Sequence, residues 1–206
     1  MLFNTLALIS LLIIITLLRR LVSIFPSLLA CLIRWKESVN LEMSVKLSRD
    51  RNILAIALII PFCLTAFHWG LYRPSFIESL SPAAGLAITI GIFTAYILLR
   101  WALTSICRSK KSRKSAYSTS IAAGRTFFII LTLLLMAIGG IMSFIGASTQ
   151  TIKDAMIWVS GAIYLLFILR RTQIFASSYN FFIVFLYLCA LEIIPTGVLV
   201  TSAMIL

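Results

Sequence analysis

Long, nearly uninterrupted apolar runs are the feature that most constrains the fold of this 206-residue chain. A helix needs about 20 apolar residues, within a range of about 17 to 25, to cross a hydrocarbon layer about 30 Å thick. Six stretches are candidates for such helices: 2–18, 52–69, 83–99, 122–147, 155–169 and 180–206. The sequence therefore predicts an all-α polytopic membrane protein, a single transmembrane domain with about six transmembrane helices.

Composition supports this fold class and excludes another. Apolar residues make up 61% of the chain and charged residues only 12%, whereas a soluble domain is about half apolar and a quarter charged. The longest segment outside the predicted spans, the loop 19–51, is too short to bury a sizeable core. A cytosolic enzyme with a charged shell is therefore excluded, and we expect no soluble catalytic domain in these loops.

The positive charge predicts an orientation. The chain has 18 Lys and Arg against 6 Asp and Glu, a net charge of +12. Seven of these cations lie between the first and second spans, seven between the third and fourth, and two after the fifth, whereas the alternate loops hold only Arg73 and Lys153. Because Lys and Arg near span ends favour the cytoplasmic side, we predict that both termini are non-cytoplasmic. A cleaved signal peptide is the alternative for residues 1–18, but its positive charge would precede the apolar region.

Two of the predicted cytoplasmic segments could meet the lipid surface. Within 19–51, an apolar series at helical spacing predicts an interfacial helix, with a loop packed under the bundle as the alternative. The series consists of Leu28, Leu32, Trp35, Val39 and Met43. The basic run 108–120 predicts contact with lipid headgroups, with a mobile, topology-fixing linker as the alternative. Its cations are Arg108, Lys110, Lys111, Arg113 and Lys114. No aromatic side chain separates these cations for base stacking, so we expect no nucleic-acid partner.

The chain contains no recognisable catalytic or phosphate-binding motif. Its four cysteines, Cys31, Cys63, Cys107 and Cys189, form no CxxC pair. We therefore expect reduced or buried thiols, no metal, no cofactor and no enzymatic activity.

Rows of small residues predict close helix packing, because small side chains let helix backbones approach each other in lipid. One row lies in the third span and consists of Ala83, Ala87, Gly91 and Ala95. The other lies in the fourth span and consists of Gly139, Ser143 and Ala147. Either row could pack within the bundle or against another membrane protein.

Glu192 is the acid that stands out inside a predicted span. It lies about 12 residues into the last span, or about 18 Å from the cytoplasmic end. An ionised side chain at that depth costs about 2.5 to 3.5 kcal/mol on insertion scales. We therefore expect Glu192 to be protonated, paired or hydrogen-bonded in the bundle interior.

Pro195 adds a second irregularity beside this acid, because it donates no hydrogen bond and leaves the carbonyl of Leu191 unpaired. By depth, we expect Arg125 from below or His68 from above to reach Glu192, although His68 is first of all an interfacial residue. The resulting intramembrane polar site has two interpretations. It is a proton or cation site in a transport path, or a polar clamp that fixes helix packing, and we favour the clamp because no repeat of broken helices is evident.

The C-terminal segment FLYLCALEIIPTGVL, residues 185–199, preceded by RRTQIF at 170–175, is the most distinctive part of the chain. Its motif YLCxLEIxP resembles an uncharacterised inner-membrane family of Bacteroidota whose domain has no known function. The resemblance would cover nearly the whole chain. It implies a multi-pass protein of the inner membrane of a Gram-negative cell, and it implies no activity.

These observations favour a non-enzymatic subunit of a larger envelope complex, with protein export or surface motility as the candidate machinery, whose partners are the lipid bilayer and other membrane proteins. A small proton- or ion-coupled transporter that uses Glu192 is the second hypothesis. A membrane-embedded enzyme acting on lipid is the weakest, since His68, Arg73 and Glu78 are too few and too ordinary.

Overall fold

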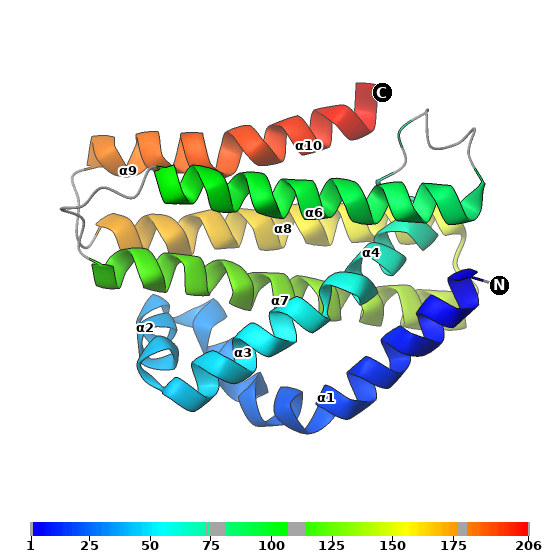
Figure 1. Cartoon of the computed structure of the whole chain (residues 1–206), viewed down its shortest axis with the longest axis horizontal. Coiled ribbons are helices and arrows are strands. Elements are labelled where there is room, and N and C mark those ends of the chain that lie inside the picture. The colour runs from blue at the N-terminus through cyan, green and yellow to red at the C-terminus, as the bar shows by residue number, and fades with distance from the viewer. Residues whose placement is uncertain (1, 73, 75–80, 107–113, 177–180, 206) are drawn as a thin grey trace.

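A computed structural model describes residues 2–72, 74, 81–106, 114–176 and 181–205, and all regular structure in these residues is helical (Figure 1). The helices are α1 (Leu2–Ile33), α2 (Trp35–Met43), α3 (Val45–Ala57), α4 (Ile59–His68), α6 (Pro82–Ile106), α7 (Lys114–Phe144), α8 (Thr149–Ala176), α9 (Phe181–Leu188) and α10 (Ile194–Ile205), with a π-helix, η1 (Cys189–Ile193), between the last two.

Six of the helical segments in the described residues are long and apolar enough to cross a membrane: 7–33, 45–68, 82–104, 118–144, 149–176 and 184–202. The predicted all-α fold with six spans is therefore confirmed. The two termini lie at the same end of the bundle, as an even number of spans requires (Figure 1). The assignment of that end to the non-cytoplasmic side stays a prediction.

The first third of the chain differs from the expected arrangement. Helix α1 does not end at Leu18 but continues through Arg19 and Arg20 to Ile33, because the residues after the two arginines are again mostly apolar. The predicted loop 19–51 is therefore almost entirely helical. Only Arg34 and Ser44, which adopt extended backbone, separate α1, α2 and α3.

The predicted interfacial helix is also divided. Leu28 and Leu32 belong to the end of α1, where Leu28 is fully buried, whereas the rest of the series lies in the nine-residue helix α2. The break at Arg34 turns this apolar series into parts of two helices. Its first part packs in the protein core and is not available to lie on a membrane surface.

Helix α7 connects the two parts of the molecule (Figure 1). On one side it packs against helices α1 to α4, which we call the N-terminal unit, through a core that consists of Ile24, Leu28, Leu54, Ala55, Leu58, Ile129 and Ile130. On the other side it packs against α8, which with α6 and the α9–η1–α10 segment forms the C-terminal bundle. One contact on this side joins Leu135 of α7 to Ile152 and Met156 of α8.

Two glycines end α4 and α7 by the same backbone device. Gly70 and Gly146 have positive φ angles of 63° and 78°, which L-residues with a side chain rarely adopt. The N–H after each glycine donates to a carbonyl five residues back, from Leu71 to Ala66 and from Ala147 to Met142. This Schellman arrangement satisfies the last carbonyls and turns the chain sharply out of each helix.

Candidate functional site

The last span is interrupted at the position of Glu192. Pro195 has no N–H, and its ring clashes with the carbonyl of Leu191, four residues earlier. The backbone responds by widening into η1, and the N–H of Ile194 donates to the carbonyl of Cys189, five residues back. Single π-turns inside α-helices occur frequently at functional sites. Here the π-turn carries Glu192, whose side chain is only 1% exposed.

Two arginines from other helices meet the Glu192 carboxylate. Nη2 of Arg100, on α6, lies 2.5 Å from Oε1 of Glu192, and Nη1 of Arg171, on α8, pairs with the same oxygen. The Arg171 side chain is 3% exposed and that of Arg100 is 30% exposed. We call these three residues the Glu192 centre. It connects three spanning segments through one carboxylate and carries a net charge of +1.

The two guanidinium groups have further contacts that hold them in place. Nε of Arg171 donates to Oγ of Ser120 on α7 at 2.6 Å. Both guanidinium groups lie over the ring of Phe167, at 5.5 Å for Arg100 and 5.7 Å for Arg171. The Arg171 group also lies 5.7 Å from the ring centre of Phe175. Cations at this distance from an aromatic face are attracted by the ring. The centre is therefore held by Ser120 on α7 and by the two phenylalanine rings on α8.

Hydroxyl groups surround the widened backbone. The Tyr164 hydroxyl donates to the backbone carbonyl of Glu192 at 3.2 Å, and the hydroxyls of Tyr96 and Thr196 lie 3.0 Å apart. Pro195, which directly precedes Thr196, is buried. These contacts provide partners for polar groups beside the π-turn, which lipid cannot provide.

The partners expected for Glu192 were wrong. Arg125 is exposed on α7, where the charges of Glu42 and Arg51 act on it. His68 ends α4 beside Trp69, with ring centres 4.8 Å apart. By charge counting, Arg100 and Arg171 were topology markers in cytoplasmic loops. The sequence does indicate that these two arginines lie inside helices. The residues that follow each arginine are apolar or uncharged, and they extend α6 and α8 by more than one turn.

The two small-residue rows lie in different surroundings. Ala83, Ala87, Gly91 and Ala95 are all exposed along α6, and a side chain added at Gly91 would meet no atom within 4 Å. Gly139 is buried instead. A Cβ there would lie 2.8 Å from Nε1 of Trp69 and from Cε of Met156.

The other two members of the α7 row complete this comparison. Ser143 is exposed near the end of α7, and Ala147 is half-buried against the core cluster of α7 and α8. Only the α7 row, through Gly139, therefore makes a close contact within the described residues.

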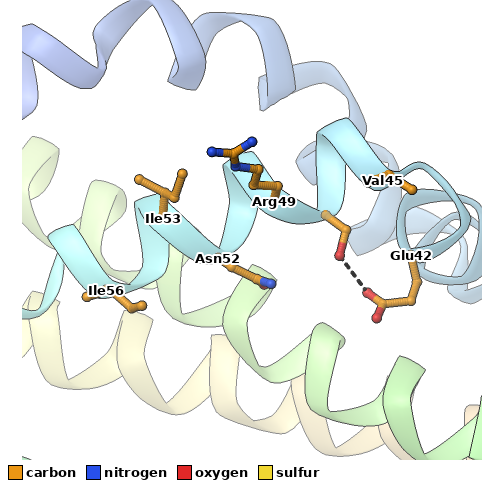
Figure 2. Close-up of a pocket in the computed structure, with 7 residues that line it drawn as sticks. Glu42, Val45, Arg49, Asn52, Ile53 and Ile56 are labelled. Carbon is orange, nitrogen blue, oxygen red and sulfur yellow. Dashed lines mark hydrogen bonds between the residues drawn. The ribbon is translucent and has the colours of Figure 1, made fainter.

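A second charge centre lies in the N-terminal unit. Arg51 on α3 is 1% exposed, and its Nη2 donates to Oε2 of Glu42 at 2.7 Å and to Oγ of Ser48 at 3.1 Å. Its guanidinium also donates to Oδ1 of Asn52 at 3.1 Å. Ser48 in turn donates to Glu42 at 3.3 Å, as the dashed line in Figure 2 shows. We call these four residues the Arg51 centre. It borders an open groove on α3, and Glu42 is 29% exposed there.

The basic run and the cysteines are the remaining features that the sequence singled out. Arg108, Lys110, Lys111 and Arg113 lie outside the described residues, and Lys114 begins α7 with its side chain also outside them. Cys31, Cys63 and Cys189 are free thiols. Among the described residues, no three His, Cys, Asp or Glu side chains gather as they would to hold a metal ion.

Comparison with known proteins gives one result. No curated protein and no solved structure matches this chain. A family model described as a domain of unknown function (DUF4271) matches residues 4–202, which include the Glu192 centre and nearly all of the six spans. The resemblance carried by the C-terminal motif is thus confirmed at the level of an uncharacterised family, and the chain belongs to the DUF4271 family.

Proposed function

We propose that this protein is a non-enzymatic, multi-pass subunit of a larger complex in a bacterial inner membrane. The observation that carries the proposal is the exposed small-residue row of α6. Ala87, Gly91 and Ala95 form a flat strip along one face of a spanning helix, with no described residue packed over Gly91. Such strips are where membrane helices approach each other most closely. The strip fits a helix of a partner protein better than it fits lipid tails.

The Glu192 centre supports the same proposal by making the α6 surface rigid. Arg100 lies on α6 a little more than one turn after Ala95 and is tied to Glu192 on η1. Glu192 is in turn tied to Arg171 on α8. A helix held in this way loses little further conformational freedom when a partner binds, which favours affinity. The clamp interpretation of Glu192 and the subunit interpretation of the protein therefore agree.

Site-specific photocrosslinking in the native host tests this proposal. A photoreactive side chain at Ala87 should form a defined, stoichiometric adduct with a membrane protein. The same side chain at Trp158, which is 80% exposed on α8, is the matched control for simple lipid exposure. The proposal fails if the two positions give the same adducts, or if neither gives a protein adduct.

A substitution measures the same contact in the purified protein. Gly91→Leu should reduce co-purification of the crosslinked partner, because the added side chain separates the helices. Gly161→Leu adds the same side chain at an exposed glycine of α8 and should leave co-purification unchanged. Equal retention of the partner by both variants would place the contact elsewhere.

The interrupted last span favours a second candidate, a small proton- or ion-coupled transporter. Discontinuous helices that present a charged group inside the membrane are typical of transport sites. In this protein, η1 interrupts the last span and carries a buried carboxylate. Transport would require Glu192 to exchange its arginine partners for a proton or a cation.

Reconstituted liposomes separate this candidate from the first. With a pH-sensitive dye inside the vesicles, a transporter should give a proton flux that Glu192→Gln abolishes and Glu42→Gln retains. Size-exclusion profiles show whether each variant is folded. An identical flux from wild-type protein and Glu192→Gln rules the transporter out.

A further inference from the structure

The groove on α3 is lined mostly by polar residues from Glu42 to Asn52, with Val45 among them, and by Ile53 and Ile56 toward its other end (Figure 2). Its volume is about 610 Å³, and it is lined by Glu42, Val45, Ser48, Arg49, Asn52, Ile53 and Ile56. All of these except Glu42 lie on one face of α3, because they are spaced by one, three or four residues along the helix. Glu42 and Val45 lie at one end and Ile56 lies at the other, with Arg49 and Asn52 between them on opposite sides of the α3 ribbon (Figure 2).

The polarity of the groove changes along the membrane depth. Helix α3 begins the second spanning segment at Val45, so Arg49 lies about one turn inside its end. Ile53 and Ile56 lie about 6 and 10 Å further along the helix, toward the membrane centre. A phospholipid has the same order of groups, with a phosphate at the interface and acyl chains below it.

The charges at the polar end leave an excess of positive charge. Glu42 is engaged by Arg51 and Ser48, so its charge is balanced within the Arg51 centre. Arg49 is exposed and has no hydrogen bond or ion pair with the residues that the structure describes. Arg125, exposed on the adjacent α7, adds a further positive charge near Glu42 and Arg51. Arg49, Arg51 and Arg125 together exceed Glu42 by two charges.

We propose that this groove is a binding site for one anionic phospholipid, with the phosphate at Arg49 and Asn52 and an acyl chain along Ile53 and Ile56. Guanidinium groups suit this ligand because their planar donors match the geometry of phosphate oxygens. The Asn52 side chain is already fixed by Arg51, so it is held at the edge of the site. Arg51 thus orders the site through Asn52 without itself lining the groove.

Native mass spectrometry of the full chain in mild detergent tests the site. Phosphatidylglycerol should be retained as a single bound lipid, more strongly than phosphatidylethanolamine with the same acyl chains. Arg49→Gln should weaken the apparent affinity for phosphatidylglycerol about fivefold, the effect of one cation near an anionic headgroup. Its affinity for phosphatidylethanolamine should fall less, because the ammonium group of that headgroup already offsets the charge of the phosphate.

Arg34→Gln is the matched control, because Arg34 is exposed at the start of α2 and does not line the groove. It should bind phosphatidylglycerol as the wild type does. Equal losses from Arg34→Gln and Arg49→Gln, or no loss from Arg49→Gln, would overturn the proposal. Arg49 is exposed, so its variant should keep the wild-type melting temperature, and a loss of lipid cannot then be attributed to misfolding.

Two further arms identify the ligand. Ile53→Ser should weaken both phospholipids, because both place an acyl chain along the apolar end. Inorganic phosphate at millimolar concentration should not displace phosphatidylglycerol. Displacement by phosphate, or binding unaffected by Ile53→Ser, would show a site for a soluble anion and overturn the assignment to lipid.

Discussion

The two charge centres of this protein use the same chemistry in opposite surroundings. In the Glu192 centre a fully buried carboxylate meets two arginines, and the three residues come from helices that are distant in the sequence. In the Arg51 centre a fully buried arginine meets a carboxylate nine residues away that is 29% exposed beside an open groove. Removal of one partner from a closed centre leaves an unpaired charge in low dielectric, whereas a centre that borders a groove is less completely enclosed by the protein. The first centre is therefore suited to hold helices together and the second to border a ligand site.

The largest effect is expected at the carboxylate of the closed centre. Glu192→Ala should lower the free energy of unfolding by about 3–5 kcal/mol, because two buried or half-buried guanidinium groups lose their counter-charge. The measurement is a denaturant titration in mild detergent micelles. Glu37→Ala, on α2 outside both centres, should change stability by less than about 0.5 kcal/mol. Equal stability of the two variants would show that the centre does not hold the bundle together.

The two arginines of the closed centre should differ from each other. Arg171→Met should cost about 3 kcal/mol, because Arg171 is 3% exposed and also bonds Ser120. Arg100→Met should cost about 1 kcal/mol, because the Arg100 side chain is 30% exposed and Glu192 keeps Arg171. The same titration compares them, and the methionine retains most of the apolar stem in both. A larger loss from Arg100→Met would reverse the assignment of the dominant pair.

The contact between α7 and the end of α4 can be tested by a substitution that changes side-chain packing and no charge. Gly139→Ala should lower stability by about 1–3 kcal/mol, because the new Cβ would lie 2.8 Å from the rigid Trp69 ring. Gly140→Ala is the matched control, since nothing lies within 4 Å of a Cβ there. It should gain up to about 1 kcal/mol from helix propensity. Similar melting temperatures for the two variants would mean that the contact between α7 and Trp69 adjusts freely.

The smallest effect is expected at the open centre. Glu42→Ala should cost about 1 kcal/mol, because Ser48 and Asn52 still accept hydrogen bonds from Arg51 and loss of the Glu42 side chain would open Arg51 to the groove. The denaturant titration used for Glu192→Ala measures this variant as well. A loss as large as that of Glu192→Ala would show that both centres are closed in the membrane, and the distinction between them would not hold.

Much of the architecture follows from the sequence. Apolar runs long enough to cross a bilayer predict the helices, and Pro195 beside Glu192 predicts an irregular last span. The prediction of helix ends was weaker in the first third. There, Arg19 and Arg20 resemble a span end, but they lie inside α1 because an apolar sequence resumes after them. Two adjacent arginines do not end a helix when the backbone can continue and their side chains can turn outward.

The site was predicted only in part. The burial of Glu192 follows from the energetic cost of an isolated charge in lipid, and this cost requires some partner. The identity of the partner does not follow, because depth along separate helices does not fix which faces meet. Arg100 and Arg171 count as topology signals in a linear sequence, although the fold turns both side chains toward one carboxylate. The remaining cations still favour the same predicted orientation.

The sequence by itself determined that this chain has six segments long and apolar enough to cross a membrane, belongs to a recognisable family and carries one conspicuous acid in the last of these segments. The tertiary structure decided that the α6 row of small residues is exposed while Gly139 of the α7 row is buried. It also decided that Glu192 meets Arg100 and Arg171, and that Arg51 borders a groove. The physical reason is that hydrophobicity sets how deep a residue lies, whereas the rotation and packing of each helix set which residues it contacts.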